Sequence, residues 1–182
     1  MPIYTKTGDK GKTRLANGQE ISKSSPIIDF LGDLDELNSY IGICISQLMI
    51  SMQVRKSIDF SIEIEVLKEI QKDLFIVGAI SSGAKLTFNP ELEVNNIEKT
   101  IDDYEKIIPK LTNFILPGGS ISASHLHYAR SRVRGLERKL VGLNSLSISP
   151  FIPYINRLSD LLFVMARYVN FKLKYKETIW KL

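Results

Sequence analysis

The sequence has one cysteine and two histidines, and proline and glycine together make up only 18 of its 182 residues. A lone Cys44 excludes an intramolecular disulfide and a cysteine-based metal site. The uncharged stretch over residues 39–54 is shorter than the ~20 residues that a membrane span needs. The first residues lack the apolar core of a signal peptide. We therefore expect a reduced, cytoplasmic protein without a membrane segment.

The charge balance excludes few function classes. Hydrophobic residues make up 44% and charged residues 24%, which excludes a disordered or low-complexity chain and favours one domain over residues 1–182. The 24 Lys and Arg exceed the 20 Asp and Glu by only four. Because the basic residues are scattered and no aromatic residues interleave with them, a helical RNA-binding protein is only an alternative suggested by the basic pI.

Apolar residues recur every three or four positions through most of the chain, which predicts helices. Pro109 is expected to stop the third helix, and Ser120 is a plausible N-cap for the fourth. The first 25 residues are polar and show no helical period. The fold class predicted is all-α, a five-helix bundle with an extended N-terminal segment over residues 1–25. The helical spacing covers residues 27–48, 62–80, 94–108, 120–143 and a segment from about 150 to 169.

The N-terminal run over residues 5–14 reads Thr-Lys-Thr-Gly-Asp-Lys-Gly-Lys-Thr-Arg. Two glycines let the backbone approach an anion, and three threonines and three lysines add donors, as a polyphosphate requires. The spacing is not that of a Walker A motif. A flexible polar N-terminus is the alternative interpretation.

An arginine stripe is predicted on the fourth helix. Arg130, Arg134, Glu137 and Arg138 are spaced i, i+4, i+7 and i+8, so they share one face. Like charges on one face favour an anionic partner, which leaves three interpretations open: a solvated face, structural salt bridges, or an anion site. Arg132 lies on another face and is expected to be solvated.

Phe114 stands beside the rigid turn of Pro117 in the loop before the fourth helix. It is either a core plug between two helices or an aromatic presented to a bulky apolar ligand. His125 and His127, two apart on a helix, point in different directions. No metal site made of protein side chains is therefore expected.

Taken together, six ordered segments resemble the PduO-type ATP:cob(I)alamin adenosyltransferases. The resemblance runs nearly the whole chain and implies a five-helix bundle that forms a homotrimer with active sites between subunits. The segments are Tyr-Thr-Lys-Thr-Gly-Asp-Lys-Gly at 4–11, Gly-Asp-Leu-Asp-Glu-Leu-Asn-Ser at 32–39, Phe-Ile-Leu-Pro-Gly-Gly-Ser at 114–120, the arginine helix, Asn-Arg-Leu-Ser-Asp-Leu-Leu-Phe at 156–163, and Glu177-x-x-Trp180.

The resemblance implies a reaction between ATP and cobalamin. The cobalt of cob(I)alamin attacks the 5′ carbon of ATP and expels triphosphate, so the protein orients the substrates and stabilises the leaving charge, with Mg²⁺ held mainly by ATP. A cobalamin reductase and an adenosylcobalamin-dependent enzyme are the partner proteins implied. The implied ATP-binding residues are Thr5, Lys6, Thr7, Gly8, Thr13, Arg14, Lys23, Arg134, Glu137, Arg138 and Asn156.

Four residues resemble those with catalytic roles in the family: Arg130, Arg134, Asp35 and Phe114. Asp35 resembles the carboxylate that pairs with Arg130 across the subunit interface. Phe114 matches the aromatic that occupies the lower face of cobalamin and excludes its axial ligand. Gly135 stands where many members have a further arginine. This departure leaves a non-catalytic carrier or sensor of cobalamin and ATP as the alternative.

Overall fold

The computed structural model describes residue 4 and residues 6–181. They form five α-helices, one short 3₁₀ helix and a two-stranded sheet. None of the helices in this part of the chain is long and apolar enough to cross a membrane. The elements are β1 (Lys12–Arg14), β2 (Glu20–Ser22), α1 (Pro26–Val54), α2 (Ser61–Ser81), α3 (Pro90–Glu105), α4 (Ile121–Gly142), η1 (Ser149–Phe151) and α5 (Ile152–Lys172).

Local sequence signals set several helix ends. The Ser120 side chain accepts a hydrogen bond from the Ala123 N–H at 3.2 Å, which confirms the predicted N-cap of α4. Asn89 caps α3 in the same way, with Pro90 as the first helical residue. The third helix ends at Glu105, earlier than the proline at 109 suggested, although Ile108 is still buried in the core.

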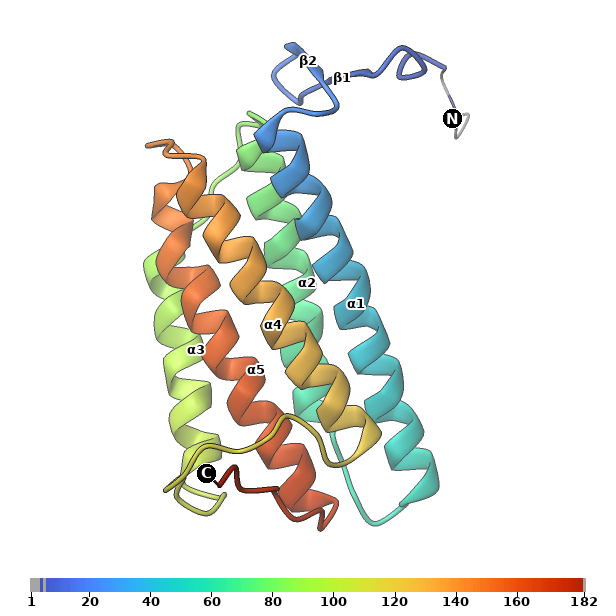
Figure 1. Ribbon diagram of the computed structural model, residues 1–182, viewed down its shortest axis with the longest axis vertical. Helices are drawn as coiled ribbons and strands as arrows, with labels where there is room; N and C mark the ends of the chain where they lie inside the picture. Colours follow the sequence, from blue (N-terminus) through green and yellow to red (C-terminus); the bar gives the residue numbers. More distant parts are fainter. Residues whose placement is uncertain (1–3, 5, 182) are drawn as a thin grey trace.

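The helices pack in the order α3, α5, α4, α1, with α2 against α1 (Figure 1). Their apolar faces meet in one core, in which Leu37, Leu67, Leu136 and Leu158 are completely buried. Each residue comes from a different helix, so burial of the apolar stripes holds the bundle together. The five-helix prediction is confirmed. Because α4 touches both α1 and α5, its two sides face different neighbours.

The N-terminal segment corrects the strictly all-α prediction. Its strands β1 and β2 pair antiparallel, with Thr13 opposite Ile21, to form a small hairpin. Figure 1 shows this hairpin beyond the end of the bundle where α1 begins. The connection between α3 and α4, which carries Phe114, lies at the opposite end of the bundle.

Candidate functional site

A pocket of about 350 Å³ lies between the α3–α4 loop, α4 and α5. It brings together two predicted residues, Phe114 and Arg130. The Phe114 side chain is 81% exposed, so the core-plug interpretation is wrong and the ring is presented outward. The lining residues are Leu111, Phe114, Ile115, Pro117, His127, Arg130, Asp160 and Phe163.

Arg130 is held at the pocket wall by α4. Its guanidinium carbon lies 5.2 Å from the centre of the Phe163 ring on α5, a cation–π contact. Burial and the nearby charge of Arg134 lower the pKa of Arg130, and Asp160 partly offsets this. Arg130 has no ion pair among the described residues. The structure therefore does not make it part of a salt bridge within the chain.

The remaining residues of the stripe lie along the same edge of α4. Arg134 and Arg138 are exposed, and the Arg138 Nη1 donates to the Arg134 carbonyl oxygen at 2.9 Å. The Asn156 Nδ2 on α5 donates to the Glu137 Oε1 at 2.9 Å, so the structure joins two predicted ATP-binding residues. A Cβ at Gly135 would meet only the Arg138 Nη2, at 3.9 Å, so this position has room for a side chain.

The N-terminal candidates form a second group. Lys23 folds back on the glycine turn, because its N–H donates to the Gly11 carbonyl at 2.9 Å. A Cβ placed on Gly8 would lie only 2.9 Å from the Lys23 Nζ, which shows how closely that amine approaches the backbone. Lys6, Thr7 and Arg14 are exposed, and Thr13 lies in β1. Thr5 lies outside the described residues.

A single chain does not bring the N-terminal candidates to Phe114. The N-terminal candidates lie at one end of the bundle, and the Phe114 loop lies at the other (Figure 1). Asp35 on α1 is exposed and has no ion pair within the described part of the chain. In particular, it does not pair with Arg130 of its own chain.

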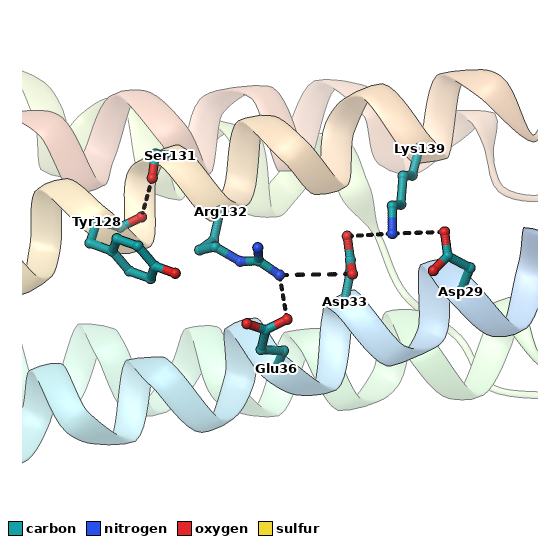
Figure 2. Close-up of polar contacts among 7 residues, drawn as sticks. All are labelled: Asp29, Asp33, Glu36, Tyr128, Ser131, Arg132 and Lys139. Atoms are coloured by element: carbon teal, nitrogen blue, oxygen red, sulfur yellow. Dashed lines mark hydrogen bonds and ion pairs between the residues drawn. The ribbon is translucent and has the colours of Figure 1, made fainter.

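The prediction that Arg132 is solvated is wrong. Figure 2 shows it pointing from α4 to α1, where it pairs with Glu36 and lies 3.8 Å from Asp33. The Lys139 Nζ lies between Asp29 at 2.7 Å and Asp33 at 2.8 Å. The three acidic residues are spaced i, i+4 and i+7 on α1, so they form the matching carboxylate stripe.

Asp160, Phe163 and His127 also line the pocket, although the sequence had predicted no site role for them. Asp160 and Phe163 follow Asn156 by four and seven positions, so helical spacing alone places Asn156, Asp160 and Phe163 on one face of α5.

His127 is buried, and its Nε2 has no hydrogen-bond partner among the described residues. Burial, with the charge of Arg130, lowers the pKa of His127 to about 4, so the ring is neutral. His125 points the other way and shares a 2.7 Å hydrogen bond with Tyr40.

A second cavity in the described residues has a different lining. An apolar groove of about 510 Å³ lies between α2 and α3, and none of the predicted site residues lines it. In the described residues, no three His, Cys, Asp or Glu side chains are grouped as metal ligands. The α4–α5 pocket is therefore the best candidate site in the structure.

Comparison with known proteins shows the family. A family model described as cobalamin adenosyltransferase matches residues 3–169. The chain belongs to this family. It is 37% identical to a cobalamin adenosyltransferase of Cupriavidus metallidurans, over 98% of the chain and 94% of that relative. It is 42% identical to a corrinoid adenosyltransferase of Bacillus subtilis, over 93% of the chain and 87% of the relative.

Solved structures of this family share the fold. Two variants of the PduO-type ATP:corrinoid adenosyltransferase from Lactobacillus reuteri, both complexed with cobalamin and ATP, are 33% identical to this chain. Their TM-scores are 0.88 and 0.89. The first match covers 99% of this chain and 97% of the neighbour, and the second covers all of both. The similarity therefore includes the N-terminal hairpin and the C-terminal segment.

Proposed function

We propose that this protein transfers the 5′-deoxyadenosyl group of ATP to the cobalt of cob(I)alamin, releasing triphosphate and forming adenosylcobalamin. The observation that carries the proposal is the pocket in which an outward-facing Phe114 lies together with Arg130, which has no ion pair in the described part of the chain. One is suited to a bulky apolar face and the other to an anion. The family and the ligand-bound neighbours support this combination of substrates.

The substrates supply both reacting atoms, since cobalt is the nucleophile and the 5′ carbon of ATP is the electrophile. The tasks left to the protein are orientation and stabilisation of the charge that develops on triphosphate. Arg130 is suited to the second task, because a guanidinium beside an apolar ring interacts more strongly with an anion than one in water. Arg134, one helical turn away and exposed, would add a second positive charge. In this proposal the triphosphate oxygens hold Mg²⁺.

Asn156 and Glu137 form the adjoining part of the proposed nucleotide site. Their hydrogen bond fixes the Asn156 amide at the edge of the α4–α5 face. The pair then offers an acceptor and a donor to the nucleoside, beside the arginines that would meet the phosphates. Phe114, with Leu111 and Ile115 beside it, would cover the lower face of cobalamin and keep an axial ligand away from cobalt.

A second copy of the chain would complete the site in a homotrimer. The N-terminal hairpin and the loop that carries Phe114 lie at opposite ends of one bundle, and Asp35 is exposed without an ion pair among the described residues. The α1 and α4 surfaces also expose Ile43, Met49, Ile50, Ile121 and Tyr128, apolar area that suits an interface. In the proposed assembly, Asp35 and the N-terminal hairpin of one subunit serve the arginines of another.

An anaerobic spectral assay tests this function. The purified protein is mixed with Mg-ATP and chemically reduced cobalamin, and adenosylcobalamin and triphosphate are measured. The expected result is many product molecules per subunit, with one triphosphate released for each. Binding of both ligands without turnover would contradict the proposed function and would instead indicate a carrier, with Gly135→Arg as the next variant.

A further inference from the structure

The end of the chain is hydrogen-bonded to the loop that carries Phe114. Residues 177–181, which we call the C-terminal strap, run antiparallel to this loop, and Ile115 bridges Ile179. The Leu116 N–H donates to the Thr178 carbonyl, and the Trp180 N–H donates to the Phe114 carbonyl, each at 2.8 Å. The strap therefore holds the backbone of Phe114 itself.

One buried guanidinium ties both segments to the bundle. The Arg167 side chain on α5 is only 4% exposed, and its Nε donates to the Glu177 Oε1 at 2.7 Å. Its Nη2 donates to the Glu177 Oε2 at 3.3 Å and to the Pro109 carbonyl at 2.8 Å. Arg167 thus anchors the start of the strap and the start of the loop together.

Asn170, nearly one turn further along α5, fixes the other end of the loop. Its Nδ2 donates to the Gly118 carbonyl at 2.8 Å, and its Oδ1 accepts from the Ser120 N–H at 2.9 Å. Gly119 lies between these bonds with a φ of +106°, and a Cβ there would clash with the Asn170 amide. Both ends of the Phe114 loop are therefore fixed by α5.

This bracing matters because Phe114 cannot fix itself. A ring that is 81% exposed has few contacts of its own, so its direction depends on the backbone that carries it. A small misplacement of a group that orients a substrate is enough to slow a reaction markedly. The Arg167–Glu177 pair has the geometry of a clamp, with two hydrogen bonds between a rigid fork and a carboxylate.

We propose that Arg167 and Glu177 are positioning residues that hold Phe114 against the corrinoid through the C-terminal strap. The proposal deepens the proposed function and rests on the role given there to Phe114. Neither residue touches a substrate in this account. They act only through the strap and the loop, so their loss should affect the corrinoid site and leave the nucleotide site intact.

The first test does not depend on activity. Trp180 is the only tryptophan in the sequence, so its fluorescence reports on the strap alone. Glu177→Ala should red-shift its emission, lower its anisotropy and increase quenching by acrylamide at least roughly twofold, because the strap is released. Lys176→Ala, an exposed neighbour, is the matched control and should leave the signal unchanged. Unchanged fluorescence in Glu177→Ala would overturn the clamp.

The second test measures cobalt ligation in the holo complex. With ATP and cob(II)alamin bound, the fraction of cobalt without a lower axial ligand is measured by electron paramagnetic resonance. Phe114→Ala and Glu177→Ala should both lose most of this fraction, while Glu177→Gln and Arg167→Lys retain part of it. The affinity for ATP should change less than about twofold in each, a split that general loss of structure would not give.

The outcomes separate the two proposals. If Phe114→Ala loses the fraction of cobalt without a lower axial ligand, but Glu177→Ala and Arg167→Lys keep it fully, the positioning role is wrong and the proposed function stands. If Phe114→Ala itself keeps this fraction, Phe114 does not exclude the axial ligand, and the positioning role of Arg167 and Glu177 is wrong as well. A parallel loss of ATP affinity in Glu177→Ala would also overturn the positioning role, since it would show general damage to the bundle.

Discussion

Helix α4 carries cations on two sides, and the two sides differ in how those charges are met. Toward α1, Arg132 and Lys139 lie among three carboxylates of the same chain (Figure 2). Toward α5, Arg130 and Arg134 have no ion pair in the described residues; Arg130 lines an open pocket, and Arg134 is exposed to solvent. Where the chain supplies its own counter-charges, the arginine stabilises the fold. Where it does not, the charge is available to a ligand.

The largest effect should come from the open side. Arg130→Ala removes a guanidinium that has no ion pair among the described residues, so we expect adenosyl transfer from pre-reduced cobalamin to fall about 100-fold or more. The free energy of unfolding should fall by only about 1 kcal/mol, because the variant loses the cation–π contact with Phe163 and no ion pair of the described residues. Turnover assays and urea unfolding measure the two quantities. Retained activity would remove Arg130 from the site.

The buried His127, which lines the same pocket as Arg130, provides the next test. Its pKa of about 4 in the folded state lies below the ordinary 6.5, so the unfolded chain binds a proton that the folded chain does not. This contribution to stability is present above pH 6.5 and is lost as the pH falls toward 4. Between pH 7.5 and 5 we expect a loss of about 2 kcal/mol.

The His127 contribution is isolated by comparing urea unfolding of the wild type and His127→Gln at both pH values. The variant is less stable at neutral pH, because the substitution disturbs the core, but its stability should decline less on acidification. The test compares how steeply the free energy of unfolding falls with pH in the two proteins. Equal slopes would show that His127 titrates normally in the folded protein.

A smaller effect is expected at the nucleotide edge of the pocket. Asn156→Ala removes one hydrogen bond to the proposed nucleoside and frees Glu137. The KM for ATP should rise about tenfold, while the KM for the corrinoid should change little. Initial rates at varied ATP and varied cobalamin separate the two constants. An increase confined to the KM for the corrinoid would show that Asn156 does not act in ATP binding.

The smallest effect should come from the closed side. Arg132→Ala breaks a partly exposed ion-pair network, which we expect to cost at most about 1 kcal/mol of unfolding free energy. Turnover should stay within about twofold of the wild type. Thermal unfolding and the same activity assay provide the check. A loss of activity comparable to that of Arg130→Ala would end the distinction between the two sides.

The sequence predicted the elements whose signals are local. Helical spacing and the Ser120 cap depend on neighbours within a few positions, and both are confirmed. The hairpin was missed, because two strands of three residues are too short to show alternation. The ion pairs between helices could not be predicted from local patterns, because Arg132 contacts carboxylates almost a hundred positions away in the sequence.

The site was predicted from the resemblance more than from the spacing. The arginine face was visible as a pattern, but spacing alone left solvent, salt bridges and an anion open as its partner. The structure then separated Arg132 from Arg130 by showing which has carboxylates beside it. Asp160 and Phe163 were missed although their positions relative to Asn156 place them on its face, because their own types suggested no chemistry without the pocket.

In the proposed homotrimer the N-terminal segment of one chain serves the pocket of another, and mixing two defective variants tests this directly. Lys23→Ala damages the segment and Arg130→Ala damages the pocket, and each alone should be nearly inactive. Co-expressed in equal amounts, they should regain about one quarter of wild-type activity, because random assembly restores that share of intersubunit sites. A mixture that stays as inactive as its components would contradict the account.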